Sequence, residues 1–351
     1  MTYEVTIAIP VYNTSEYIEK SLVSALNQTF ESIEFLVIDD KGTDNSMDIV
    51  CTLKEAHPRG KDIRIIDHIN NKGTGATKNT AIRESRGKYL YFMDSDDYIE
   101  PNTIEILYNI ANSTHAEVVM GSYRRVRDGK EIGTGVFPYL SIDSIENVIS
   151  KWMRVTHLYY PVPTWNKLYL TEMLRNNKIY CIPHHRNEDS VFSFQIALFA
   201  KSIVSIPDIT YNYSEVSSST VHQSINDFYY KQYVEIFNER KKLMINNKDK
   251  WTPEIINYFV EPFFSYFIRG LLISNQSKQR KKEFLSKISS IYDMGLQSRH
   301  ISGFRYKLVY HLLPYSYMFL KFFYMIDDKT MALYNISNSF LKFTKLPYNH
   351  L

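Results

Sequence analysis

The sequence predicts an α/β fold, in which a mostly parallel sheet flanked by helices is followed by a mainly helical C-terminal region. Short apolar runs alternate with helix-like segments from about residue 5 to residue 121. The runs are nearly continuous in apolar residues, which is typical of parallel strands buried on both faces. From about residue 225 onward the segments become helical in pattern, aromatic and rich in lysine. The 351 residues, 44% of them hydrophobic, are enough to bury a substantial core.

Five candidate strands follow one another in the first part of the chain. They cover residues 5–9, 35–38, 63–66, 89–93 and 118–120. Between the first two, Ile18, Leu22 and Leu26 recur at helical spacing, which predicts a helix that connects these strands. Open parallel sheets bind ligands beyond the carboxyl ends of their strands, so we expect the loops after several strands to converge on one pocket. After about residue 122 the pattern loosens and indicates an α+β half, with a boundary near residues 220–225.

The bulk composition argues against several classes of protein. The 41 lysines and arginines are nearly matched by 38 aspartates and glutamates, so the net charge of +3 gives no support to a nucleic-acid partner. Cys51 and Cys181 lie far apart without metal-ligand spacing, which favours reduced thiols in a cytosolic protein. Neither a secretory signal nor a run of about 18 apolar residues is visible, so no spanning helix is expected. We therefore expect a cytoplasmic protein, either free or peripheral on the inner face of the cell membrane.

A cluster of carboxylates follows the fourth candidate strand. Asp94, Asp96 and Asp97 come directly after the apolar run at residues 89–93, so three acids emerge together where a buried strand ends. Oxygen-rich clusters suit Mg²⁺ or Mn²⁺, which usually bridge a few carboxylates to the phosphates of a substrate. The cluster therefore predicts a divalent cation and a diphosphate.

Two further motifs lie at expected strand ends. Pro10 fixes φ and has no N–H, so the loop Pro10–Asn13 is expected to end sheet pairing and to leave backbone groups free beside a nucleobase. Asp39 and Asp40 end the second strand, where a carboxylate can accept a hydrogen bond from a base or a ribose. Asp44 is expected to cap the helix that begins near Ser46.

Two helix starts carry charged side chains. The segment 71–79 is flanked by glycine and contains Lys72 and Lys78, which either steady the charge of a nucleotide or lie on a solvated surface. The segment 187–192 places Glu188 and Asp189 at the start of a helix whose apolar residues are expected to be buried. Negative side chains are stabilised by the dipole at a helix N-terminus, so a purely local role stays open for both.

Taken together, these ordered motifs resemble the family 2 glycosyltransferases, which have the GT-A fold, a Rossmann-like and mostly parallel sheet flanked by helices. The resemblance covers roughly residues 3–220 and includes Trp165–Tyr169. By this resemblance Asp40 faces the uracil, Asp94 touches the ribose, and Asp96 holds a Mn²⁺ or Mg²⁺ ion that bridges both phosphates. The nucleotide site that the resemblance implies consists of Pro10, Val11, Tyr12, Asp40, Lys72, Lys78, Asp94 and Ser95.

The same resemblance assigns catalytic roles. It implies that Asp189 is the general base of an inverting displacement and that Glu188 orients the acceptor, unless Glu188 only favours the helix N-terminus. His222 lies where some GT-A enzymes carry a lid with a metal-binding histidine. The sequence departs from the family at residues 41–43, where Lys-Gly-Thr replaces the usual Gly-Ser, and at Lys78, where arginine is more frequent. Lysine lacks the bidentate fork of arginine, so a phosphate contact there is geometrically weaker.

The implied function is that of an inverting, metal-dependent glycosyltransferase of the bacterial surface-polysaccharide type. It would move a sugar from a nucleoside-diphosphate sugar, expected to be UDP-linked, to a glycan or lipid-linked acceptor hydroxyl. Residues 1–222 would form the GT-A domain, with a nucleotide-binding half at 1–121 and an acceptor-binding half at 122–222. Residues 223–351 would form the helical C-terminal region, whose helices, such as 304–310, either contact a membrane surface or form an internal core.

Three other classes fit the sequence less well. A dinucleotide-dependent oxidoreductase needs G-x-G-x-x-G after the first strand, where this chain has Pro10–Asn13. A sugar nucleotidyltransferase shares the sheet and the metal-binding acids, but usually carries a glycine-rich basic loop after its first strand. A non-catalytic nucleotide-binding scaffold of a polysaccharide assembly complex is the remaining alternative, and the presence of the acids at 40, 94, 96 and 189 argues against it.

Overall fold

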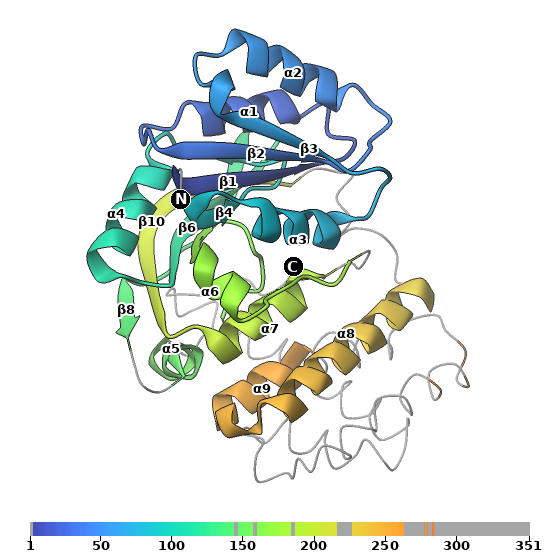
Figure 1. Ribbon diagram of the computed structural model, residues 1–351. Coiled ribbons are helices and arrows are strands. Elements are labelled where there is room, and N and C mark those ends of the chain that lie inside the picture. The colour runs from blue at the N-terminus through green and yellow to red at the C-terminus, as the bar shows by residue number, and fades with distance from the viewer. Residues whose placement is uncertain are drawn as a thin grey trace. The chain divides into compact units, whose positions relative to one another are not determined.

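The computed structural model describes residues 3–143, 147–156, 160–183, 187–215 and 227–262, together with residues 277, 279 and 283, and the structural statements below concern these residues. The chain divides into two compact units, Met1–His222 and Gln223–Leu351. The first unit holds the sheet and helices α1 to α7 (Figure 1). The second unit holds α8 (Asp227–Asn246), a short 3₁₀ turn at Lys248–Lys250, and α9 (Pro253–Pro262).

Strands and helices alternate along the first half of the first unit, as the apolar pattern predicts. They run in the order β1 (Tyr3–Val11), α1 (Ile18–Leu26), β2 (Ile33–Asp39), α2 (Ser46–Ala56), β3 (Ile63–Asp67), α3 (Thr74–Glu84), β4 (Gly87–Phe92), β5 (Tyr98–Ile99), α4 (Thr103–Thr114) and β6 (Val118–Arg127). The second half contains β7 (Lys130–Gly135), β8 (Leu140–Asp143), α5 (Val148–Thr156), β9 (Lys167–Leu170), α6 (Thr171–Asn176), α7 (Asp189–Phe199) and β10 (Ser202–Ser214). The five predicted strands correspond to β1, β2, β3, β4 and β6, and the predicted connecting helix is α1.

One sheet organises the described part of the first unit, with strands in the order β3-β2-β1-β4-β9-β6-β10-β5. Strands β3, β2, β1 and β4 are mutually parallel, and β6 is parallel to β10. Between these two parallel sets lies β9, which runs antiparallel to both β4 and β6. The sheet is therefore mixed, because the short strand Lys167–Leu170 joins its two halves.

Helices cover both faces of the sheet because successive strand residues point in opposite directions. Ile7 and Phe35 belong to the set that packs with Ile18 of α1, and residues of α2 and α4 contribute to the same core. Phe92 belongs to the opposite set and contacts Phe192 of α7 edge to face, with ring centroids 5.8 Å apart. In Figure 1, α3, α6 and α7 lie together over this second face.

The carboxyl ends of β1 and β4 separate at one edge of the sheet. Strand β1 pairs with β2 as far as Val11, opposite Asp39, whereas its register with β4 ends at Ala8, opposite Phe92. The expectation that Pro10 ends sheet pairing is therefore correct for the β4 side and wrong for the β2 side. The separation gives the acidic loop after β4 room to leave the sheet beside β1.

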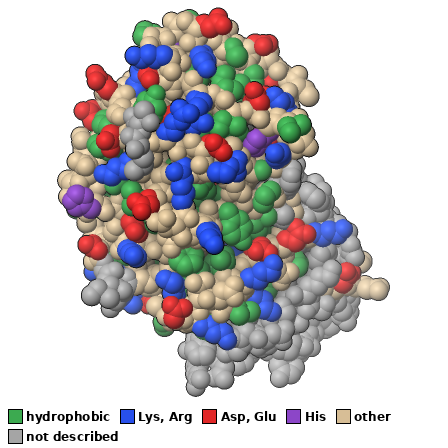
Figure 2. Space-filling model, viewed as in Figure 1, with side chains coloured by type: hydrophobic (Ala, Val, Ile, Leu, Met, Phe, Trp, Pro, Cys, Tyr) green, Lys and Arg blue, Asp and Glu red, His purple; other side chains and the backbone are tan. Residues whose placement is uncertain are grey.

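The second unit is helical where it is described. Phe237 of α8 and Phe259 of α9 pack with ring centroids 5.4 Å apart, and buried Arg240 donates a hydrogen bond to the carbonyl of Tyr258. None of the described helices is long and apolar enough to cross a membrane. Residues 304–310 lie outside the described residues, so their contact with a membrane stays a prediction. On the face shown in Figure 2, basic and acidic side chains are interspersed over the described residues.

Candidate active site

The three acids after β4 lie together in the structure. One carboxylate oxygen from each of Asp94, Asp96 and Asp97 lies within 4.8 Å of the others. Asp97 is anchored, because its Oδ2 accepts a hydrogen bond from the Tyr211 hydroxyl at 2.7 Å and its Oδ1 accepts one from the Ser214 N–H at 2.6 Å. The loop is therefore fixed to β10 through Asp97, while Asp94 and Asp96 are partly exposed.

Burial and mutual repulsion raise the pKa values of these acids. Burial is the largest cause for all three, and it brings the pKa of Asp94 to about 6, with Lys78 opposing the shift and Asp96 adding to it. The pKa of Asp97 is raised well above its ordinary value by burial and by the facing Asp96 and Asp94. Three closely spaced carboxyl groups that resist joint ionisation are a suitable donor set for a hard divalent cation, so the residues fit Mn²⁺ or Mg²⁺.

Asp40 organises the loop between β3 and α3. It is buried, its Oδ1 accepts the Lys72 N–H at 2.9 Å, and its Oδ2 accepts the Gly73 N–H at 2.8 Å. His68, which the motif analysis did not single out, faces Oδ1 with its Nδ1 at 2.7 Å and faces Thr80 with its Nε2. Gly73 has φ 81°, a conformation that favours glycine at the start of α3. Asp40 thus holds the loop, and its expected contact with a uracil stays a prediction.

The loop after β1 lies beside the loop after β2. Val11 is buried, whereas Tyr12 is 47% exposed at the carboxyl edge of the sheet. Asn13 accepts the Thr43 N–H at 2.6 Å, which ties the two loops together. The expected cap at Asp44 is not found, because the N-cap of α2 is Asn45, whose side chain makes no capping hydrogen bond. Asp44 lies one residue earlier, and its Oδ1 accepts hydrogen bonds from the N–H and the hydroxyl of Ser46. The side chain of Tyr12 is therefore exposed at the edge where a base is expected.

Lys78 lies in the interior, which excludes the expected alternative of a solvated surface position. Its side chain is 2% exposed, and its Nζ lies 2.9 Å from Glu188 Oε1 and 2.7 Å from Asp189 Oδ1. Burial acts to lower the pKa of Lys78, but the facing Asp189 and Glu188 outweigh it, so the pKa lies well above its ordinary value. Lys78 is therefore the cationic partner of the acid pair. Lys72, six residues earlier, is exposed and contacts Asp40 through its backbone N–H.

Glu188 and Asp189 sit at the start of α7 in different environments. Burial raises the pKa of Glu188 to about 7, although Lys78 opposes the shift. Asp189 is the more exposed of the two, at 18% against 12% for the Glu188 side chain. Its carboxylate also faces Thr164, whose N–H donates to Oδ2 at 3.2 Å and whose hydroxyl donates to Oδ1 at 3.3 Å.

Helix α3 is fastened to the segment before α7. Asn79 donates to the Cys181 carbonyl at 2.8 Å and accepts the Cys181 N–H at 2.7 Å. Gly75 allows close approach, because a Cβ at this position would lie 2.1 Å from the Ile182 carbonyl oxygen. Residues more than a hundred positions apart are thereby held in register, which explains how Lys78 reaches the acid pair.

Lys167 is a second buried cation near Asp189. It is 3% exposed and donates hydrogen bonds to the carbonyls of Pro161 and Pro163. Burial lowers the pKa of Lys167 to about 7. The nearby Asp189 opposes this shift, whereas the positive charge of Lys78 adds to it.

The lowered pKa of Lys167 predicts a pH dependence of stability. Between pH 7 and about 10 the unfolded chain keeps a proton on this lysine that the folded chain releases, so the contribution of Lys167 to the free energy of unfolding rises with pH. Replacing Lys167 with methionine removes that rise, which amounts to a few kcal/mol at most. The difference in melting temperature, variant minus wild type, is therefore expected to be largest at pH 6.5 and to fall steadily towards pH 9.5. A difference that stays flat over this range would contradict the lowered pKa.

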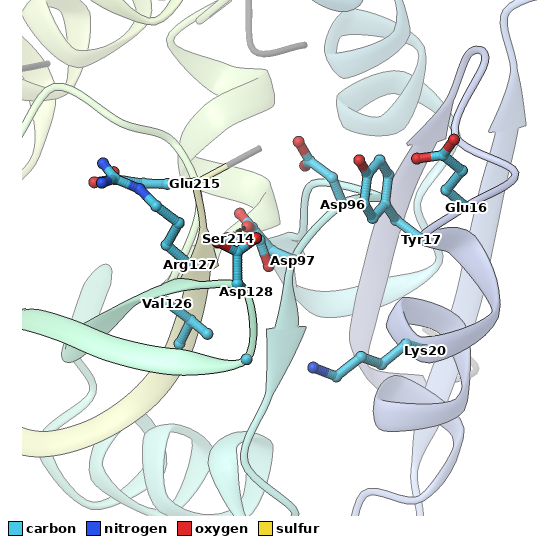
Figure 3. A pocket seen from close by; sticks show the side chains of 11 residues that line it. Glu16, Tyr17, Lys20, Asp96, Asp97, Val126, Arg127, Asp128, Ser214 and Glu215 are labelled. Atoms are coloured by element: carbon cyan, nitrogen blue, oxygen red, sulfur yellow. Dashed lines mark hydrogen bonds and ion pairs between the residues drawn. The ribbon is translucent and has the colours of Figure 1, made fainter. Parts of the chain in front are cut away.

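A pocket of about 480 Å³ adjoins the acidic cluster. Glu16, Tyr17 and Lys20 line one side of it, and the turn between β6 and β7 lines the other with Arg127 and Asp128 (Figure 3). Asp96 and Asp97 also line it, as do Ser214 at the end of β10 and Glu215 directly after it. His222 follows shortly after this strand but lies outside the described residues, so its role as a metal ligand stays a prediction.

The site combines clustered acids beyond a parallel strand with a second acid pair at the start of α7. In open α/β sheets, the carboxyl ends of the strands are where ligands bind. Residues 6–175 match the family model described as glycosyl transferase family 2. This part of the chain is therefore a family 2 glycosyltransferase domain, as the motifs predict.

Curated proteins with similar sequences carry matching descriptions. A poly(ribitol-phosphate) beta-glucosyltransferase of Bacillus spizizenii is 32% identical over 60% of this chain and 32% of its own length. The glycosyltransferase GlyG of Streptococcus pneumoniae is 27% identical over 68% of this chain and 80% of its own length. The chain thus spans about a third of the Bacillus protein and most of the streptococcal one.

Solved structures confirm the fold. The crystal structure of Staphylococcus aureus TarS 1–349 in complex with UDP-GlcNAc superposes with a TM-score of 0.73 at 19% identity, covering 89% of this chain and 87% of that one. A mannosyltransferase from Pyrobaculum calidifontis, solved with GDP-Man and Mn²⁺, gives a TM-score of 0.53 at 13% identity over 83% of this chain and 76% of its own. The predicted GT-A fold is therefore confirmed.

Proposed function

We propose that this chain is an inverting glycosyltransferase that moves a sugar from a UDP-sugar to a hydroxyl of a bacterial surface glycan or its lipid-linked precursor. The observation that carries the proposal is the presence, at one edge of a family 2 domain, of the acidic cluster Asp94–Asp97 and the separate, cation-held pair Glu188 and Asp189. The first set suits a metal and a diphosphate, and the second suits a proton acceptor. The proposed metal-assisted, inverting transfer uses both.

Asp189 is proposed to take the proton of the acceptor. Its Oδ1 faces both Lys78 and the Thr164 hydroxyl, whereas its Oδ2 accepts one hydrogen bond from the described residues, that of the Thr164 N–H. A carboxylate oxygen has two lone pairs, so Oδ2 can accept one more hydrogen bond, from an attacking hydroxyl. As that hydroxyl oxygen attacks the anomeric carbon, its proton passes to Oδ2 and the bond to the diphosphate breaks on the opposite side of the carbon.

The acidic cluster supports departure of the nucleotide. Asp96, with Asp94 and Asp97 beside it, would hold Mn²⁺ or Mg²⁺, which when bound supplies a positive charge against the charge that grows on the leaving diphosphate. Asp97 keeps the loop in place through Tyr211 and Ser214. The exposed ring of Tyr12 and the Asp40-bound loop would contact the uridine.

The acceptor is proposed from the relatives. Two of the similar curated proteins are named for transfer to poly(ribitol phosphate), one for glucose and one for N-acetylglucosamine. An acceptor panel for this chain should therefore include poly(ribitol phosphate) and neutral bacterial glycans, offered with UDP-glucose and UDP-GlcNAc. Formation of a glycosylated polymer, detected by mass spectrometry, identifies donor and acceptor together.

Nucleotide binding is expected to depend on Asp96 and the metal. With UDP at about a hundred times its dissociation constant and Mn²⁺ present, the melting temperature should rise by roughly 5–10 °C, and much less with UDP or Mn²⁺ alone. Asp96→Asn should lose most of the joint effect because a metal ligand is removed. The exposed strand residue Asp143 offers a matched control, and Asp143→Asn should behave like the wild type. A metal-linked rise that persists in Asp96→Asn would exclude this residue as the ligand, and selective stabilisation by nucleoside triphosphates would favour a nucleotidyltransferase.

A further inference from the structure

Residues 160–164 form a segment that belongs to no helix or strand. Two of its five residues, Pro161 and Pro163, have no N–H, so the segment cannot form a regular ladder of backbone hydrogen bonds. Side chains bind its carbonyls instead. Ser193 of α7 donates to the Val162 carbonyl, and Tyr169 of β9 donates to the Thr164 carbonyl at 3.2 Å.

Lys167 binds two further carbonyls of this segment. Its Nζ donates to the Pro161 carbonyl at 3.1 Å and to the Pro163 carbonyl, and it lies 5.3 Å from the centre of the Tyr160 ring. Four consecutive carbonyls, from 161 to 164, are therefore each held by a side chain. Lys167 is the group that holds two of them.

The chain turns sharply between the segment and Lys167. Asn166 has φ 57°, and its side-chain amide donates to the Gly121 and Ser122 carbonyls at 2.8 and 3.0 Å. Its Oδ1 accepts hydrogen bonds from Thr210 at 2.7 Å and from Tyr91 at 3.2 Å. These hydrogen bonds fix the turn to the sheet. The turn brings the Lys167 side chain back to the carbonyls of residues 161 and 163.

The far end of the segment reaches Asp189. Thr164, which is fully buried, contacts both oxygens of the Asp189 carboxylate, through its N–H and its hydroxyl. Lys78 contacts the same carboxylate from α3. Among the described residues, Lys78 and Thr164 therefore set the direction of the Asp189 side chain, and the contact with Thr164 depends on where the segment places that residue.

We propose that Lys167 is a positioning residue for the general base, which acts by holding residues 160–164 so that Thr164 orients the Asp189 carboxylate towards the acceptor. The inference rests on the proposed function, because it concerns the base of that reaction. A buried lysine is costly to desolvate, and an apolar side chain would fill the same space at lower cost, so a lysine here fits a role that needs donors at two carbonyls at once. A displacement of about 1 Å at a reacting group can cost on the order of a hundredfold in rate, so a small shift of Thr164 is enough to matter.

The test compares four variants of the full chain in UDP release and product formation with a UDP-sugar and Mn²⁺. Lys167→Met should lower kcat by about 10- to 100-fold and leave the donor KM within about twofold, because the nucleotide site is untouched. Thr164→Val should do the same to a smaller extent, whereas Thr164→Ser, which keeps the hydroxyl, should restore activity. The exposed lysine variant Lys201→Met serves as the control and should match the wild type.

A double-mutant cycle with Asp189→Asn decides between positioning and general damage to the fold. Once the base is absent, adding Lys167→Met should change the residual rate by less than about threefold, since positioning an absent base has no effect. An equal loss in both backgrounds would overturn the inference, and so would a Lys167→Met enzyme with wild-type kcat. If Lys167→Met does not fold, the Thr164→Val and Thr164→Ser pair decides, and equal activity of these two overturns it. Absence of transfer by the wild type with every UDP-sugar would instead refute the proposed function.

Discussion

Replacing Asp189 with asparagine is expected to lower the rate of sugar transfer by about a hundred- to ten-thousandfold, the range that proton transfer to a positioned side chain contributes. Asparagine has nearly the same shape, and its single oxygen can still accept hydrogen bonds from Lys78 and the Thr164 hydroxyl. Its amide nitrogen cannot accept the Thr164 N–H, and the amide cannot take up the acceptor proton. The acidic cluster that would hold the metal belongs to a different loop. The affinity for UDP with Mn²⁺ should therefore stay within a few-fold of the wild-type value, which isothermal titration calorimetry can measure.

Glu188 provides the matched control for this prediction. It is the neighbouring residue, it bonds to the same Lys78 Nζ, and its side chain is the less exposed of the pair. Glu188→Gln keeps a side chain of similar size and should cost less than about tenfold in rate, because Asp189 retains its contacts. A larger loss in Glu188→Gln than in Asp189→Asn would reverse the assignment and make Glu188, whose pKa lies near 7, the proton acceptor.

The fold was accessible from the sequence because its signals are local. Short continuous apolar runs such as residues 35–38 and 89–93 are typical of buried strands, and Ile18 and Leu22 show the helical period between the first two strands. The strand β9 was less accessible, since four residues at 167–170 give too short a pattern to reveal an antiparallel strand between two parallel sets. A strand of this length is defined by its partners, which lie far away in the sequence.

The acidic cluster was accessible for the same reason. Asp94, Asp96 and Asp97 are consecutive or nearly so, and the end of one strand brings them together without help from the rest of the chain. The motif also predicted that Glu188 and Asp189 open a helix, and α7 begins at Asp189. A group of ligands that lies within one short loop can be predicted from the sequence of that loop alone.

The cations of the site were not accessible in this way. A lysine at a helix start, such as Lys78, is expected in solvent unless its partner is known, and its partners lie 110 and 111 residues away. His68 and Lys167 are comparable cases, because each is a single residue whose role depends on Asp40 or on a proline segment placed by the tertiary fold. Buried charges are compensated across the structure, and sequence spacing does not report that compensation.

Lys78 balances the negative charges of Glu188 and Asp189, so its replacement is expected to have a large effect on stability. Lys78→Met removes the one ammonium group that faces both Glu188 and Asp189 among the described contacts, and leaves two partly buried carboxylates beside each other. Removing one partner from a buried ion pair typically costs about 3–5 kcal/mol, since the remaining charge is not solvated. The melting temperature at pH 8 should therefore fall by on the order of 10 °C.

The pH dependence of that loss identifies its cause. The pKa of Glu188 is already raised to about 7 by burial in the presence of Lys78, and loss of the ammonium should raise it further. A carboxyl group with a raised pKa in the folded state is protonated and harmless at low pH and becomes a cost as pH rises through that value. The destabilisation by Lys78→Met should thus be smaller at pH 5.5 than at pH 8, and Lys78→Met/Glu188→Gln should recover part of the stability at pH 8. A loss of equal size at both pH values would mean that the lysine stabilises the fold through its packed methylene chain and not through its charge.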